Sequence, residues 1–180
     1  MAMGMEGSEL VIRKMQKKDC ADAGKFCRNT MKWMHEKYLK GVYPKEAAEC
    51  DANMKSGAQL AKRLNDPQMF SFVALSDDTI SGIVLGMTYG KSGLAKVNWI
   101  AVDPKHQHEG IGIRLMMATE DYLRGKGCHK IFINTLPPLI PAIRLYMKFG
   151  LLPEAYLRKH WWGTDFIVMS KWIGDYRKRS

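Results

Sequence analysis

The sequence predicts one α/β domain, in which a mixed sheet of about seven strands is flanked by about four helices. Three observations predict this fold class. Short apolar segments rich in β-branched residues alternate with segments of helical periodicity. A strand leads through a glycine turn directly into a helix between Leu94 and Leu123, and two further strands close the chain as a hairpin. The 180 residues suit a single domain over 1–180, with a core over about residues 10–173 and a basic tail over 174–180.

Each element follows from local signals. We expect strands over residues 10–14, 70–75, 79–89, 97–102, 130–135, 151–160 and 164–172. Ser76, Asp77 and Asp78 predict a hairpin turn between the second and third strands. We expect helices from Asp19, as N-cap, to about residue 38, and then over 45–64, 111–123 and 141–150. Gly57 weakens the second of these helices, which suits a mobile lid.

The composition narrows the class of protein. A content of 46% hydrophobic and 26% charged residues argues against a disordered chain. The sequence contains neither a stretch of membrane-spanning length nor a leader-like N-terminus, so we expect a cytoplasmic protein without a membrane partner. Cys20, Cys27, Cys50 and Cys128 form no Cys-x-x-Cys pair, which favours reduced structural thiols and no metal site. The net charge of +10 would attract a phosphate-bearing ligand or RNA, or it is a solvated basic surface without a specific partner. It argues against a polyamine substrate unless a local acidic pocket exists.

The stretch from Leu94 to Leu123 predicts an anion site. Asp103 and Pro104 end a buried strand, and Gly110 and Gly112 then begin a helix. The first N–H groups of a helix lack internal partners and carry the positive end of its dipole, so they bind phosphate. Glycines allow the phosphate to approach the backbone. A dinucleotide fingerprint does not fit, because the third glycine and the acidic residue at the end of the next strand are missing.

Two motifs together resemble the GNAT acetyltransferase superfamily. One is Gln-x-x-Gly-x-Gly after the strand that ends Ile-Ala-Val-Asp-Pro, and the other is the segment Ala-Ile-Arg-Leu-Tyr-Met-Lys-Phe-Gly-Leu at 142–151. The resemblance implies a GNAT fold whose sheet is splayed between its fourth and fifth strands, with acetyl-CoA as co-substrate and a primary amine as acceptor. It implies that the co-substrate contacts Ile100, Ala101, Val102, Gln107, His108, Glu109, Gly110, Ile111, Gly112, Ile113, Arg114 and Asn134.

The resemblance also makes Tyr146 the catalytic residue, a general acid for the departing thiolate. A phenol of pKa near 10 suits this role, whereas the alternative is a core tyrosine whose hydroxyl bonds the backbone. The general base stays open. Relatives that acetylate ribosomal-protein N-termini carry glutamate where this chain has Asn134 and asparagine where it has Leu139. The candidates for the base are Glu36, Asp51, His160 and a water chain. Without the glutamate, an acceptor amine of low pKa is favoured.

The function that follows is N-acetyl transfer from acetyl-CoA to a primary amine, either a small molecule or a protein N-terminus. The alternative is a non-catalytic acyl-CoA-binding or RNA-associated basic module, with RNA the less favoured partner. The closing hairpin is somewhat similar to the ribosomal-protein N-acetyltransferase branch. The sequence leaves open the acceptor and whether two copies pair as a homodimer.

Overall fold

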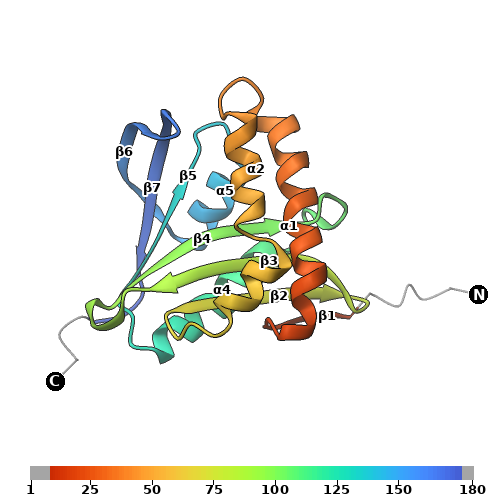
Figure 1. Ribbon diagram of the computed structural model, residues 1–180. Helices are drawn as coiled ribbons and strands as arrows, with labels where there is room; N and C mark the ends of the chain where they lie inside the picture. The colour runs from red at the N-terminus through yellow and green to blue at the C-terminus, as the bar shows by residue number, and fades with distance from the viewer. Residues whose placement is uncertain (1–8, 176–180) are drawn as a thin grey trace, which may run out of the picture.

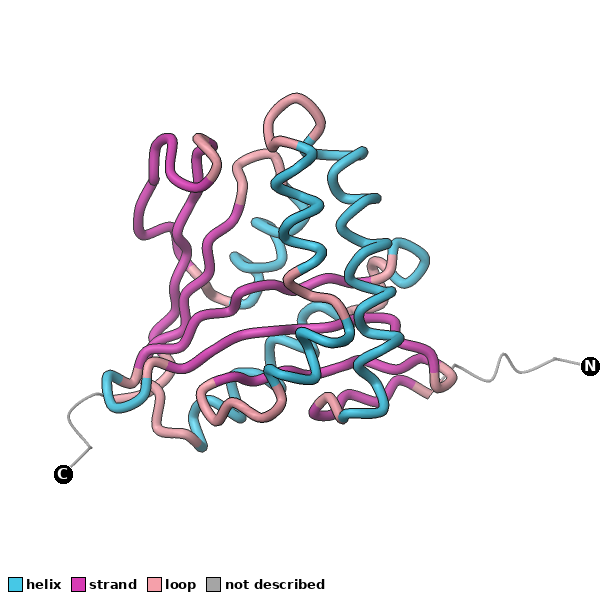
Figure 2. The backbone as a smooth tube through the Cα atoms, viewed as in Figure 1, coloured by secondary structure: helices cyan, strands magenta, loops and turns pink. Residues whose placement is uncertain are grey.

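The computed structural model describes residues 9–175 and is built around a seven-stranded sheet in the order β1-β2-β3-β4-β5-β7-β6 (Figures 1 and 2). The strands are β1 (Leu10–Lys14), β2 (Met69–Ser76), β3 (Thr79–Thr88), β4 (Leu94–Val102), β5 (Lys130–Thr135), β6 (Leu152–Trp161) and β7 (Thr164–Trp172). The α-helices are α1 (Cys20–Met34), α2 (Lys45–Asn53), α3 (Gly57–Arg63), α4 (Ile111–Gly125) and α5 (Ile140–Phe149). β4 and β5 are parallel, and the other neighbouring strands are antiparallel. The predicted mixed sheet of seven strands is therefore confirmed. Most of the expected basic tail, residues 176–180, lies outside the described residues.

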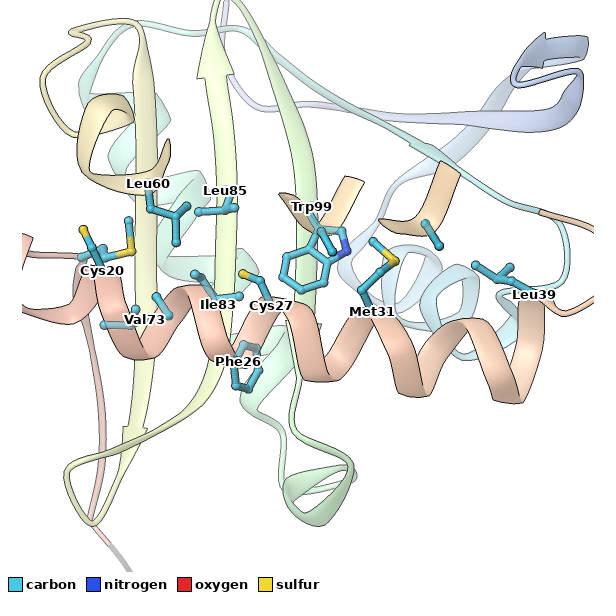
Figure 3. Close-up of a cluster of buried hydrophobic side chains, with 14 of the residues drawn as sticks. Cys20, Phe26, Cys27, Met31, Leu39, Leu60, Val73, Ile83, Leu85 and Trp99 are labelled. Carbon is cyan, nitrogen blue, oxygen red and sulfur yellow. The ribbon is translucent and has the colours of Figure 1, made fainter. Parts of the chain in front are cut away.

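Helices cover both faces of the sheet. α1 and α2 lie in front of it in Figure 1, while α4 and α5 lie behind. Figure 3 shows the cluster on the front face, where Val73, Ile83 and Leu85 of the sheet lie against α1 and the short α3. The second cluster joins Phe72 and Ala74 to residues of α4 and α5. Successive residues of β2 thus point to opposite faces, as strand geometry requires.

A β-bulge interrupts β4 at Asn98. Val97 lies opposite Gly86 and Trp99 lies opposite Leu85, so β4 has one residue more than β3 at this point. The extra residue reverses the alternation, because Val97 packs in the rear cluster and Trp99 in the front cluster. A bulge bends its strand and increases the local twist. β4 also makes its last pair with β5 at Val97. The bulge therefore marks the point at which the two parallel strands separate.

The predicted helix over 45–64 is wrong in one respect, because it is two helices, α2 and α3, and the total becomes five α-helices. Gly57 begins α3 and packs against the backbone of α1, and a Cβ added to Gly24 would lie 2.4 Å from the backbone nitrogen of Gly57. The glycine serves a close contact between α3 and α1, and a mobile lid in this segment stays a prediction. Met54 and Ala58 are exposed in the folded chain, while Leu60 is fully buried.

The first predicted helix is confirmed, since α1 continues through one π-helical turn to Leu39. Asp19, however, does not cap it with its side chain. Its carboxylate instead accepts two hydrogen bonds from Arg13, at 2.7 and 2.9 Å, and one from the backbone N–H of Gln16. Across residues 9–175, the helices are too short or too polar to cross a membrane.

Candidate active site

Beyond the bulge, one edge of β4 is open. Ile100, Ala101 and Val102 pair with β3 on one side, while β5 pairs with β4 only as far as Ile133 and continues along β7. Figures 1 and 2 show β5 rising away from β4. The open edge covers residues 98–102, roughly 17 Å of extended chain. The predicted splay between the fourth and fifth strands is confirmed, and it leaves backbone N–H and C=O groups of β4 available to an extended ligand.

A cavity of about 380 Å³ occupies the splay. Ile100 borders it from β4, Asn134 from β5 and Tyr146 from α5, so three of the predicted site residues come together here. Side chains of α1, α2, α3 and the closing hairpin complete the wall. The cavity thus joins the rear face of the sheet, where α5 lies, to the front face. Its volume is that of a small-molecule site.

Tyr146 reaches this cavity from a buried position. It lies one helical turn after Ala142, which also lines the cavity, and only 4% of its surface is exposed. Within residues 9–175 its hydroxyl makes no hydrogen bond, so the alternative of a core tyrosine bonded to the backbone does not describe this side chain. Burial raises the pKa of Tyr146 above its ordinary value. The phenol therefore stays protonated at neutral pH and has a proton to donate.

The glycine turn lies at the far end of the open edge. His108 and Gly110 adopt left-handed backbone conformations, with φ of 70° and 79°, and α4 begins at the next residue. Gly110 is the N-cap and has no side chain to satisfy the first N–H groups. Open space surrounds the position that its Cβ would occupy. A Cβ on Gly112 would instead lie 3.0 Å from Leu145 of α5. Gly110 exposes the backbone, while Gly112 allows two helices to pack.

The predicted residues therefore form a line rather than one cluster. The turn residues Gln107 to Ile113 and the exposed Arg114 follow the carboxyl end of β4, outside the cavity. Ala101 and Val102 lie between this turn and the cavity. Of the candidate bases, Asp51 and His160 line the cavity and the exposed Glu36 does not. The phenol of Tyr43 donates a hydrogen bond of 2.8 Å to the Asp51 carboxylate.

The sequence did not single out three cationic side chains of the cavity wall, Lys55, Arg63 and Lys96. Burial lowers the pKa of each of them. Lys55 donates a hydrogen bond of 2.8 Å to the backbone oxygen of Asp51 and lies 5.3 Å from the ring centre of Trp99. No motif marks these positions, and on a predicted helix Lys55 and Arg63 resemble ordinary surface residues.

Solved structures of other proteins share this architecture. The PaiA N-acetyltransferase from Thermoplasma acidophilum, solved in complex with coenzyme A, is 21% identical with a TM-score of 0.77, covering 91% of this chain and 99% of that chain. The ribosomal-protein-S5-alanine acetyltransferase from Vibrio fischeri is 19% identical with a TM-score of 0.71, covering 97% and 99%. The ribosomal-protein-S18-alanine N-acetyltransferase from Escherichia coli is 18% identical with a TM-score of 0.68, covering 96% and 99%. At these identities the likeness establishes the fold. No curated protein gives a significant match in sequence.

A sheet opened between parallel strands over a cavity, with a glycine turn beside it, is the architecture that this chain shares with those acetyltransferase structures. The model of the acetyltransferase (GNAT) family matches residues 29–151, and the chain belongs to this family. The resemblance found in the two motifs is thereby confirmed, and acetyl-CoA is the co-substrate that membership of this family implies.

Proposed function

We propose that the protein is an N-acetyltransferase that moves an acetyl group from acetyl-CoA to a primary amine by direct attack. One observation carries the proposal: the phenol of Tyr146, whose pKa is raised by burial, lies in the cavity where the open edge of β4 begins. The uncapped N–H groups at the start of α4 and the unpaired edge of β4 fit a co-substrate with a diphosphate and a peptide-like arm. The residues that the sequence predicts to be catalytic or to bind the co-substrate keep those roles in this proposal.

Acetyl-CoA supplies the thioester carbon that the amine attacks. The N–H groups from His108 to Ile113 hold the diphosphate, and Gln107 and Arg114 add side-chain contacts. Ile100 to Val102 pair with the arm, and a backbone N–H on this edge polarises the acetyl carbonyl. As the new C–N bond forms and the C–S bond breaks, Tyr146 gives its proton to the departing sulfur. The surplus proton of the amine passes to Asp51, His160 or water, and the tyrosinate regains a proton.

The test combines binding with turnover. The purified protein is titrated with CoA in a calorimeter and then given acetyl-CoA with amines, and release of free thiol is followed. We expect CoA binding and amine-dependent thiol release. Absence of CoA binding at millimolar concentration would refute the proposal. CoA binding without turnover, together with salt-sensitive RNA binding, would favour the non-catalytic basic module that the net charge of +10 also suits.

The asparagine at position 134, where the ribosomal-protein N-acetyltransferase relatives carry glutamate, adds a narrower expectation about the acceptor amine. Asn134 cannot accept a proton, so among the amines of a peptide the α-amine, with a pKa of about 7.7–8.0, is a better acceptor than a lysine side chain with a pKa of about 10.4. A peptide with a free N-terminus should therefore react faster than an N-blocked peptide that contains one lysine. A preference for the lysine peptide would contradict this expectation.

A further inference from the structure

The acceptor side of the cavity carries excess positive charge. Lys55, Arg63 and Lys96 line it, whereas Asp51 contributes its one carboxylate. One oxygen of that carboxylate already accepts a hydrogen bond from the hydroxyl of Tyr43. An amine substrate is itself a cation in water, so this wall repels a polyamine or any acceptor whose only charge is its ammonium. The wall is suited to an acceptor that also carries a negative group.

Arg63 and Lys55 lie away from the predicted phosphate site. α3, which ends at Arg63, packs through Leu60 next to Leu85 in the front cluster, which also contains Trp99 and Cys27 (Figure 3). The glycine turn opens α4, whose buried side chains belong to the rear cluster. The sheet therefore lies between Arg63 and the predicted phosphate site. Lys55 precedes α3 and lies over the ring of Trp99 on the same front face.

Arg63 lacks the partners that a shielded guanidinium normally has. Its Nε and Nη2 atoms are covered from water and have no hydrogen-bond acceptor within residues 9–175. Asp66 is near enough to attract it, but its carboxylate accepts from the backbone N–H of Gln68, and the described residues show no ion pair between Asp66 and Arg63. Burial raises the pKa of the neighbouring Cys27 thiol to about 12, so Cys27 stays neutral. The fold leaves two donors on one edge of Arg63 to be satisfied by something else.

We propose that the acceptor is a primary amine that also bears a carboxylate, a small amino acid by chemical class, and that Arg63 and Lys55 hold this carboxylate. This inference rests on the proposed function and names its substrate class. Nε and Nη2 form the edge of a guanidinium that matches the two oxygens of a planar carboxylate. Both atoms are covered in this conformation, so the Arg63 side chain, which lines the cavity, turns this edge toward the ligand on binding. Lys55 has donors beyond the one that it gives to Asp51. The apolar wall, which includes Met31, Leu39 and Phe166, receives an aliphatic or aromatic side chain. The amine then points toward the splay and Tyr146.

The experiment measures binding, and it needs no turnover. Protein saturated with CoA is titrated in a calorimeter with leucine and phenylalanine, with leucinamide and phenylalaninamide, and with phosphoethanolamine. Each amide keeps the amine and the side chain but lacks the carboxylate. We expect the amino acids to bind at least about tenfold tighter than their amides, the usual scale for a charge-assisted pair. Equal affinities for acid and amide, or no binding of either, would overturn the inference. Tighter binding of phosphoethanolamine would assign the site to phosphate and overturn the carboxylate.

Two variants test whether Arg63 holds the carboxylate of the acceptor. Arg63→Met should lower amino-acid affinity by about 10- to 100-fold and abolish the difference between acid and amide. The matched control is Lys62→Met, which removes the same charge from the neighbouring, exposed position and should leave both unchanged. CoA affinity and the urea midpoint show that each variant is folded, and the comparison of acid with amide in the unmodified protein needs no variant. An Arg63→Met effect no larger than the control would refute the assignment. A protein that binds CoA and acetylates acids and amides alike would fail this inference alone and keep the proposed function.

Discussion

Replacing Tyr146 by phenylalanine separates catalysis from stability. The change deletes one hydroxyl from a side chain that is 4% exposed and makes no hydrogen bond within residues 9–175. A general acid contributes roughly 10²- to 10⁴-fold to the rate, or about 2.7–5.4 kcal/mol of the barrier. The hydroxyl faces the cavity and is not among the side-chain atoms covered by protein, so its removal should change the free energy of unfolding by less than about 1 kcal/mol. The variant should thus be slower and about as stable.

The assay pairs thiol release at saturating acetyl-CoA with urea unfolding of both proteins. CoA affinity, measured by calorimetry, serves as the control and should not change. Because burial raises the pKa of Tyr146 above its usual value, wild-type turnover should not fall between about pH 7 and pH 9, where the phenol keeps its proton. Unchanged turnover in Tyr146→Phe would refute the assignment. A loss of stability would show that the hydroxyl has a structural partner instead.

Three further predictions concern the turn, an ion pair and a helix contact. Gly110→Ala forces an alanine to φ near 79° and should weaken CoA binding, measured by calorimetry, at least about tenfold. In Gly112→Ala the new Cβ meets only the flexible end of a leucine, so the CoA affinity measured in the same way should change less than about threefold. Asp19→Asn should lower the free energy of unfolding by about 1–3 kcal/mol at pH 7, because the carboxylate accepts two hydrogen bonds from Arg13, which lowers its pKa. This stabilisation is present above the ordinary Asp pKa of about 3.9 and is lost as the pH falls through the lower pKa of the folded state. The urea midpoints of the two proteins should therefore converge in acid. Gly24→Ala places a Cβ 2.4 Å from a backbone nitrogen of α3, so it should destabilise by about 1–3 kcal/mol despite better helix propensity, as urea unfolding can measure.

The architecture could be predicted from the sequence because local patterns determine most of it. Asp77 and Asp78, both with positive φ, form the hairpin turn that their residue types predict, and the alternation in β2 matches two covered faces. The break between α2 and α3 could not be predicted in this way. It depends on the backbone of Gly57 touching α1, a contact between segments more than thirty residues apart. The hydrophobic periodicity of residues 45–64 does not indicate that contact.

The donor side of the site was accessible to sequence reasoning for the same reason. A strand, a turn with Gly110 and a helix start are consecutive in the chain, so their chemistry can be inferred locally. The open edge of β4 is partly a consequence of the bulge at Asn98, and the residue types in this part of the strand do not predict a bulge. Tyr146 enters through the family motif, but its burial and its unbonded hydroxyl required the structure.

The acceptor side depends on the broken helix. In one continuous helix, positions 55 and 63 would be separated by about 12 Å along the axis, since each residue rises 1.5 Å. In the folded chain both side chains line one cavity, and beyond the larger effect of burial the charge of Arg63 further lowers the pKa of Lys55. Two cations held near one another in a partly dry site are unfavourable unless an anion joins them. The close approach of Gly24 and Gly57 fixes the start of α3 against α1. The contact that sequence periodicity missed is thus the one that assembles the charge expected to select the substrate.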